Sequence, residues 1–498
     1  MRQFALFSLA VILSSSLWAG CSSSSALDVT VITSPVLDQA PFAGVDRVEL
    51  RWRRPGVDPV IQHGSWPAGT TELTLHPPPL VDNTVLELAA VSNGVVVAIG
   101  RTPPLASDAN ATSVYVGLVN QFSSTATPRP LASARFGASA TMLGDGRVLI
   151  AGGATRGAPG VPDPSSISAM VDLYDPTSGT FAAFTGAADF AERIYHAAGA
   201  TPDGGVLFAG GLGKFGPLDD IYAIGPTRSA SIGKLPSPRW AAASTSLDDG
   251  SLLVVGGYTD SDGMGGGTLA TDAVIVDPSG SVSTVALPAP RAFAVATRLS
   301  DGNVLVTGGR DTTGVLDSGL VFDAGAKSFS MLSPSGDARL AMQVPRVSHT
   351  ATLLPSGAVF LFGGNDGRES VGNTELWTPD SGGFVDTHVF NLQPRERATA
   401  TALGDGTVVL AGGETSPQPL ATPSPVLDPI VYRPAPGMTT GVLDDDLTDA
   451  SARAEATSTA LIDGSVLYLG GGVSNPRTLA GGAEIFVPCF GPCLDLTP

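Results

Sequence analysis

The sequence predicts an all-β protein in which a seven-bladed β-propeller follows a small β-sandwich. Three observations lead to this fold class. A glycine pair recurs seven times, at intervals of 46 to 58 residues. An arginine stands seventeen residues before the first glycine of every pair, and another glycine stands six residues before it. A repeat of roughly this length with such regular punctuation is typical of propeller blades.

Each repeat, named by its order in the chain, begins at its arginine. The arginines are Arg135, Arg193, Arg239, Arg291, Arg346, Arg395 and Arg453, and the pairs begin at Gly152, Gly210, Gly256, Gly308, Gly363, Gly412 and Gly470. We expect the propeller to span residues 135–498.

Within a repeat, the pattern predicts four short antiparallel strands. The first two flank an Asp-Gly step, or Ser356-Gly357 in the fifth repeat. Asp-Gly between two apolar runs predicts a two-residue hairpin, because both turn positions then require positive φ. A third strand follows a variable loop, with proline just beyond it in six repeats, and a weaker fourth strand completes the sheet. Such a sheet has two apolar faces, and a ring of seven covers both.

Residues that recur in all seven repeats serve the fold, because a binding site on a ring of similar blades must break the symmetry. We therefore expect the arginines to be structural, each tying the start of a strand to loop carbonyls. The loops after the glycine pairs vary most in length and composition. Loops held by a rigid scaffold commonly carry function, so we expect a ligand on that face.

The N-terminus has the pattern of an export signal. Residues 1–20 combine one basic residue, an apolar core and a small-residue end, and are too short for a membrane span. The run Leu17-Trp18-Ala19-Gly20-Cys21 resembles the bacterial lipoprotein signal, in which the cysteine is lipidated. That resemblance implies a membrane anchor at Cys21, with a serine-rich tether over 21–26, and Ser22 points to the outer membrane. An ordinary export signal is the alternative.

Residues 27–121 lack the repeated pattern of arginine and glycine pair. They show alternating strand patterns, which favour an immunoglobulin-like β-sandwich. It is either a spacer or a binding domain. Alternatively, the segments around 93–100 and 113–122 are strands of a degenerate extra blade. Residues 122–134 are rich in Ser, Thr and Pro and predict a linker.

The net charge of −19 argues against nucleic acid and anionic membrane surfaces as partners. We expect a monomer that binds a protein or carbohydrate.

The repeats resemble those of kelch propellers, and the second resembles the galactose-oxidase branch of that family. It reads Arg193-Ile194-Tyr195-His196, followed by Pro202-Asp203-Gly204. The resemblance implies Tyr195 and His196 as a candidate copper pair. The cysteine-linked tyrosine and the second histidine of that branch have no counterpart here, so we expect no cofactor and no catalytic residue. The galactose-oxidase branch implies a copper oxidase as one alternative function, and kelch propellers in general imply a sugar mutarotase as another. Either activity would be located at the channel mouth.

Four residues near the starts of first strands are the candidate ligand-binding set: Tyr195, His196, Trp240 and His349. His349 has the register of His196, three residues after its arginine, which favours a structural role for both. Asp260-Ser261-Asp262-Gly263 is a fragment of a calcium loop, and we expect a solvated turn there. Cys489 and Cys493 predict a disulfide, because an exported chain meets an oxidising compartment.

Overall fold

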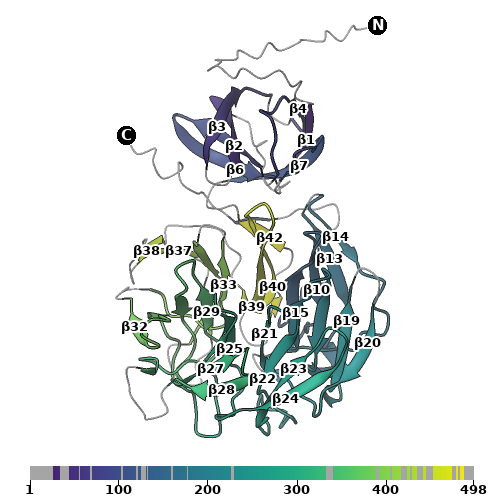
Figure 1. The fold of residues 1–498 in the computed structure, drawn as a ribbon, viewed down its shortest axis with the longest axis vertical. Coiled ribbons are helices and arrows are strands. Elements are labelled where there is room, and N and C mark those ends of the chain that lie inside the picture. Colours follow the sequence, from purple (N-terminus) through teal and green to yellow (C-terminus); the bar gives the residue numbers. More distant parts are fainter. Residues whose placement is uncertain are drawn as a thin grey trace. The chain divides into compact units, whose positions relative to one another are not determined.

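The structure is a computed structural model of the 498-residue chain. It describes residues 26–33, 44–54, 57–67, 70–82, 84–102, 105–118, 122–124, 131, 133–158, 161–176, 178–225, 229–332, 340–387, 392–403, 406–416, 423–426, 429–434, 441–444, 453–473, 478–479 and 483–486. The predicted signal segment, Cys21, Cys489 and Cys493 lie outside these residues. Within them every regular element is a strand except short 3-10 turns, so the expected all-β class is confirmed (Figure 1). The chain divides into two units, residues 1–120 with 487–498, and residues 121–486.

The first unit contains one seven-stranded sheet with the order β3-β2-β5-β6-β7-β1-β4. Its strands are β1 (Leu27–Thr33), β2 (Arg47–Arg54), β3 (Val57–Gly64), β4 (Glu72–Leu75), β5 (Val85–Ser92), β6 (Val95–Arg101) and β7 (Ala111–Leu118). β1 pairs with β7 in parallel and with β4 in antiparallel. It therefore joins the two parts of the expected sandwich into one sheet, and the immunoglobulin-like assignment stays a prediction.

Two sequence expectations for this unit need correction. β6 and β7 pair within this sheet, so most of the two segments considered for an extra blade belongs to the first unit, and only Phe122, at the end of the second segment, pairs in the other unit. The strand patterns that favoured a sandwich did not include β3, because Pro59 and the polar residues at its end obscure its alternation. Its partner is β2, whose Val48, Leu50 and Trp52 enter the apolar core of the unit.

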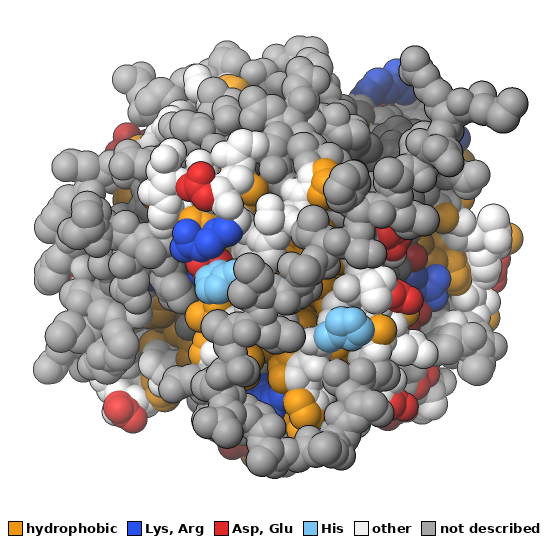
Figure 2. Space-filling model, turned by 90° about the horizontal axis from the view of Figure 1, so that it is seen from above, with side chains coloured by type: hydrophobic (Ala, Val, Ile, Leu, Met, Phe, Trp, Pro, Cys, Tyr) orange, Lys and Arg blue, Asp and Glu red, His pale blue; other side chains and the backbone are white. Residues whose placement is uncertain are grey.

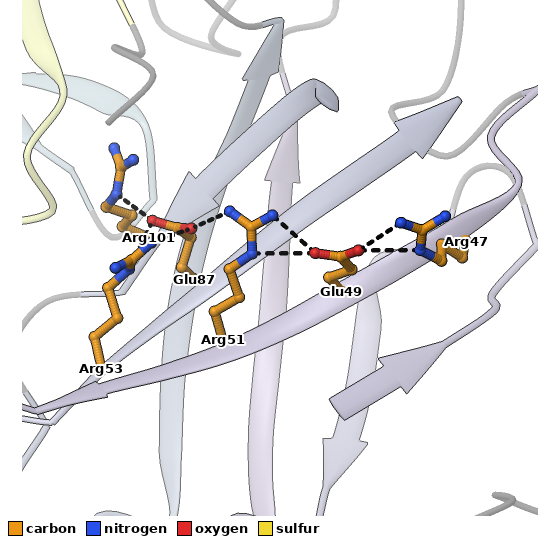
Figure 3. Close-up of polar contacts among 6 residues, drawn as sticks. All are labelled: Arg47, Glu49, Arg51, Arg53, Glu87 and Arg101. Atoms are coloured by element: carbon orange, nitrogen blue, oxygen red, sulfur yellow. Dashed lines mark hydrogen bonds and ion pairs between the residues drawn. The ribbon is translucent and has the colours of Figure 1, made fainter. Parts of the chain in front are cut away.

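The other face of β2 carries a chain of ion pairs (Figure 3). Glu49 lies between Arg47 and Arg51, with an N–O distance of 2.8 Å to each. Glu87 on β5 has no exposed surface and pairs with Arg51 at 3.0 Å. Arg53 and Arg101 also bind Glu87. Burial alone would raise the pKa of Glu87, but the surrounding guanidinium groups outweigh burial and hold that pKa below its usual value.

The repeats form seven sheets in the part of the chain that the structure describes, one for each repeat. The first three contain β9 (Ser139–Met142), β10 (Val148–Ala151), β13 (Val171–Asp175) and β14 (Thr180–Ala183); β15 (Ala197–Ala200), β16 (Val206–Ala209), β19 (Asp220–Ile224) and β20 (Ser229–Lys234); and β21 (Ala243–Ser246), β22 (Leu252–Val255), β23 (Asp272–Val276) and β24 (Val282–Ala286). All their strand pairs are antiparallel.

The next three sheets repeat this order. They contain β25 (Val295–Arg298), β26 (Val304–Thr307), β27 (Gly319–Asp323) and β28 (Ser328–Met331); β29 (Thr350–Leu353), β30 (Val359–Phe362), β31 (Thr374–Trp377) and β32 (Phe384–Asp386); and β33 (Thr399–Ala402), β34 (Val408–Ala411), β37 (Ile430–Pro434) and β38 (Gly441–Asp444). In all six sheets the second strand ends directly before the glycine pair.

The seventh sheet differs in two ways. It contains β39 (Ala454–Ala460), β40 (Val466–Val473) and β42 (Ala483–Phe486), with the small strand β41 (Thr478–Leu479) beside β40. β40 continues through its glycines. The strand next to β42 is β8 (Phe122–Ser124), which comes from the segment expected to be a linker. The first strand of residues 121–486 therefore completes the sheet of the last repeat.

The loops after three glycine pairs form small ribbons: β11 (Gly157–Ala158) with β12 (Val161–Pro162), β17 (Leu212–Gly213) with β18 (Gly216–Pro217), and β35 (Glu414–Thr415) with β36 (Ser424–Pro425). A single 3-10 turn, η1 (Pro164–Ser166), lies in the first of these loops.

The Asp-Gly hairpins are not the expected two-residue turns. In the first repeat the amide of Leu143 donates to the carbonyl of Arg147, which leaves a three-residue loop, and only its last residue, Gly146, has positive φ. This geometry is a turn followed by a left-handed glycine. The Oδ1 atom of Asp145 accepts a hydrogen bond from the amide of Arg147. The aspartate therefore recurs because its side chain caps the turn.

The glycine pairs connect each repeat to the next. The amide of every second glycine donates to the carbonyl of the next repeat's arginine, at 2.8 or 2.9 Å. In the last repeat Gly471 donates to Arg135, so the series returns to the first repeat. The first glycine of each pair has no room for a side chain, because a Cβ atom there would lie 2.2 to 2.4 Å from that same carbonyl oxygen. First strands also contact one another in sequence, and β39 contacts β9.

Acidic and basic side chains are interspersed on the face shown in Figure 2. The net charge of −19 is thus not gathered into one acidic patch among the described residues of that face. None of the described segments forms a helix with the length and apolar character needed to cross a bilayer.

Candidate functional site

The seven repeat arginines are buried, each at most 2% exposed. Six of them donate to the carbonyl of the first glycine of their own pair, as Arg193 does to Gly210 at 3.0 Å. Arg239 binds the carbonyl and carboxylate of Asp272 instead. The expected structural role, with loop carbonyls as partners, is confirmed.

Sequence reasoning missed the acidic partners of these arginines. Among the described residues, five carboxylates at the start of a third strand pair with a repeat arginine, namely Asp172, Asp220, Asp272, Glu375 and Glu484. A recurring acidic residue at that point was the available signal. The fourth repeat has Ser318 there, whose hydroxyl accepts from Arg291.

The position two residues after each arginine is where the repeats differ. Its occupants are Gly137, Tyr195, Ala241, Phe293, Ser348, Arg397 and Glu455. All seven have φ between 52° and 63°, the left-handed region that side chains disfavour. Six of the eight described non-glycine residues with positive φ occupy this position. Because this left-handed backbone recurs in all seven repeats, it serves the fold, and the repeats differ here only in the side chain that it presents.

These left-handed residues are joined by backbone hydrogen bonds. The amide of Ala241 donates to the carbonyl of Tyr195, Phe293 donates to Ala241, Arg397 to Ser348 and Glu455 to Arg397. Gly137 of the first repeat donates to Glu455 of the seventh, at 3.1 Å. These hydrogen bonds bring together residues that are far apart in sequence.

Five of these residues line a cavity of about 300 Å³. The others in its lining come from the loop after the third pair, from Arg310, and from neighbouring strand starts. The lining comprises Tyr195, Met264, Gly265, Phe293, Arg310, Val347, Ser348, His349, Arg397, Ala398, Glu455 and Ala456. We call this cavity the mouth pocket. Its size is at the lower end of the range of small-molecule sites.

Tyr195 reaches across the first repeat to the seventh. Its hydroxyl donates to Glu455 Oε2 at 3.1 Å. The residue between them is Gly137, where a Cβ atom would lie 2.7 Å from Ile194 Cγ1 and 3.1 Å from Tyr195 Cε1. Glycine at this position therefore leaves room for both side chains. Phe293 packs edge-on against Tyr195, with 6.0 Å between ring centroids.

Arg397 has three carboxylate partners. Its Nη1 lies 2.8 Å from Glu396 and 2.9 Å from Glu414, and its Nε lies 3.5 Å from Glu455. Burial alone would lower the pKa of Arg397, but the three carboxylates outweigh burial and raise it. The guanidinium is therefore charged and fully compensated.

Trp240, a predicted ligand residue, lies outside the lining of the mouth pocket. It is 1% exposed, and its Nε1 donates to the carbonyl of Asp260 at 2.8 Å. Its ring packs against Tyr195, at 6.2 Å between centroids, and edge-on against Phe293. Trp240 supports the aromatic wall from behind.

The two predicted histidines occupy equivalent places. His349 Nε2 lies 2.9 Å from Thr307 Oγ1, and His196 Nε2 lies 2.8 Å from Ser139 Oγ. Each ring lies against the first glycine of the preceding pair, Gly308 or Gly152. Burial first, and the neighbouring repeat arginine second, lower the pKa of each to about 3. Both histidines are therefore neutral and pack between neighbouring repeats. His349 also lines the mouth pocket.

The copper pair implied by the resemblance does not come together. Tyr195 lines the mouth pocket, whereas His196 lines a second cavity of about 380 Å³ among the first strands. Neither cavity is lined by both residues, and each side chain has its own protein partner. Nowhere in the described part of the chain do three or more His, Cys, Asp or Glu side chains gather as a metal would require. The residues therefore do not fit a copper centre.

The two aspartates of the calcium-loop fragment accept hydrogen bonds from within their own loop. Asp260 accepts hydrogen bonds from the amide and hydroxyl of Thr268. Asp262 accepts from the amides of Met264 and Gly266. These contacts shape the loop that leads to the mouth pocket.

No protein-family model and no curated protein sequence matches the chain. Among solved structures, a fungal alcohol oxidase of the AA5 family, determined in complex with copper, resembles it with a TM-score of 0.54. The alignment covers 71% of this chain and 74% of that one at 16% identity. A likeness at this identity concerns the fold alone. The comparison supports the galactose-oxidase-like fold expected from the repeats, and the copper is a property of the neighbour.

Proposed function

We propose that this chain is a lipid-anchored, extracytoplasmic carbohydrate-binding protein that lacks catalytic activity and holds its ligand in the mouth pocket. Its seven sheets are the blades of a closed kelch-type propeller, preceded by an immunoglobulin-like domain. The hydrogen bonds from each glycine pair to the next arginine, including Gly471 to Arg135, support the closure.

The mouth pocket itself carries the functional proposal. The residues that recur hold the scaffold, whereas the lining uses a position that differs in every repeat. Aromatic faces from Tyr195 and Phe293 stand beside charged hydrogen-bonding groups from Glu455 and Arg397. An apolar wall with a few fixed polar groups is the usual composition of a small-molecule site, and a sugar ring presents both kinds of surface.

The anchor rests on the N-terminal signal and on Cys21. Diacylation holds a protein on a bilayer without a membrane-spanning helix, and Ser22 favours the outer membrane. Metabolic labelling of the full chain with an alkyne-bearing fatty acid should modify the wild type and leave Cys21→Ser unlabelled. A wild-type chain without label would overturn the anchor and leave the pocket proposal intact.

Binding is tested by incubating the labelled full chain on an array of mono- to tetrasaccharides. Ser348→Tyr fills the pocket at a position whose backbone already has φ of 56°, and should abolish the wild-type signal. Ser279→Tyr, at an exposed turn between β23 and β24, is the matched control and should retain it. An array without signal, or a signal that survives Ser348→Tyr, would overturn the proposal.

The competing function is a copper oxidase, which the copper-bound neighbour favours. Metal analysis after incubation with copper should find less than stoichiometric metal, and no peroxide should form from a sugar alcohol and oxygen. Stoichiometric copper that is lost in both Tyr195→Phe and His196→Ala would replace the binding role by catalysis.

A further inference from the structure

Arg310 differs from every other charged residue that lines the mouth pocket. It directly follows a glycine pair, and its Nε donates to the hydroxyl of Tyr258 at 2.9 Å. Its Nη2 donates to the carbonyl of Gly265. Its Cζ atom lies 5.0 Å from the ring centroid of Phe293 and 5.7 Å from that of Tyr258. The guanidinium is thus held in a fixed orientation by uncharged groups.

No carboxylate forms a direct ion pair with this guanidinium among the described residues, whereas Arg397 has three carboxylate partners. Asp262 interacts with Arg310 only at longer range, since backbone hydrogen bonds from Gly266 and Met264 first, and the charge of Arg310 after them, lower the pKa of Asp262. Glu455 is the one carboxylate in the pocket lining, and Arg397 and Tyr195 already engage it. An arginine has five N–H donors, and the contacts of Arg310 use two of them. The planar fork that remains matches a carboxylate in bidentate geometry.

Resting on the carbohydrate-binding role above, we infer that the ligand of the mouth pocket carries a carboxylate, as hexuronic acids do, and that Arg310 selects it. The carboxylate binds the guanidinium of Arg310, while Phe293 and Tyr195 pack on the ring. Hydroxyl groups of the ligand bind Glu455 and Ser348. A singly charged carboxylate suits the pocket better than a phosphate dianion, because Glu455 and the two glutamates behind Arg397 repel the larger charge.

Calorimetry on the full chain with three probes of one ring tests this inference: glucuronate, glucose and glucose 6-phosphate. We expect glucuronate to bind at least tenfold more tightly than glucose, and added salt to reduce that preference. In Arg310→Gln the affinity for glucuronate should fall to that for glucose, with the affinity for glucose changed less than threefold. Arg310→Lys should retain part of the preference, because the charge remains but the fork is lost.

Arg310→Gln also removes a contact to the loop at Gly265, so circular dichroism and thermal melting must first establish that the variant is folded. The exposed pair Arg298–Asp248 offers the control Arg298→Gln, which should leave all three affinities unchanged. Equal affinity for glucose and glucuronate, or a preference for glucose 6-phosphate, would overturn the carboxylate assignment while the carbohydrate role stands. Absence of binding by all three sugars, together with a silent array, would instead overturn the carbohydrate role itself.

Discussion

The first glycine of each pair should be intolerant of alanine for a reason that can be separated from backbone strain. In the fifth repeat, Gly363 has φ of 66° and Gly382 has φ of 62°. A Cβ atom at Gly363 would lie 2.4 Å from the carbonyl oxygen of Arg395, whereas a Cβ atom at Gly382 would have no atom within 4 Å. Both substitutions therefore impose the same left-handed alanine, and only Gly363→Ala forces two repeats apart.

A left-handed alanine costs about 1 kcal/mol. Moving the Arg395 carbonyl also breaks its 2.9 Å hydrogen bond from the amide of Gly364, which leaves buried polar groups unsatisfied at about 1–3 kcal/mol. We expect Gly382→Ala to lower the free energy of unfolding by about 1 kcal/mol and Gly363→Ala by about 3 kcal/mol. Urea denaturation followed by tryptophan fluorescence measures both. Losses that agree within about 0.5 kcal/mol would refute the proposed contact between repeats.

Three further predictions concern Glu87, His349 and the two C-terminal cysteines. Glu87→Gln leaves buried Arg51 and Arg101 without their shared carboxylate, so urea denaturation should show a loss of about 3 kcal/mol in the free energy of unfolding. As the control, Asp145→Asn in an exposed ion pair should change the free energy of unfolding by less than about 0.5 kcal/mol. Because the pKa of Glu87 is lowered in the folded state, the contribution of this carboxylate to the free energy of unfolding is complete above its unfolded pKa of about 4.5. That contribution is lost as the pH falls through the lower folded pKa. If the free energies of unfolding of Glu87→Gln and of the wild type change in parallel down to about pH 3, this prediction is wrong. The pKa of His349 is lowered from 6.5 to about 3, so the unfolded chain binds the extra proton between these values and stability falls as pH drops from 6.5 toward 3; His349→Gln should therefore destabilise the protein less at pH 4 than at pH 7. Cys489 and Cys493 should resist thiol labelling in the folded, unreduced chain, and labelling of both would exclude the disulfide.

Some sequence expectations failed at the level of local geometry. The Asp-Gly step indicated a hairpin correctly, but the length of its loop depends on which residues pair on either side. Arg147 pairs with Leu143, where a two-residue turn would require Gly144. The resemblance implied His196 as a copper ligand, whereas the register that it shares with His349 favoured a structural role. The contact of His196 with Ser139 depends on how repeat 2 packs on repeat 1, which no single repeat encodes.

The sequence by itself determined the all-β class, the seven repeats, most of their strands and the structural role of the arginines. These features depend on side-chain alternation and on turn residues within about 50 residues of chain, so they can be read locally. Only the tertiary structure decided the mouth pocket. Tyr195 and Glu455 are 260 residues apart, and they meet because backbone hydrogen bonds link the seventh repeat to the first and because Gly137 between them has no side chain. The charge of Arg310 is likewise inconspicuous in sequence, and its proposed role in recognition depends on the contacts with Phe293, Tyr258 and Gly265 that hold the guanidinium at the mouth pocket.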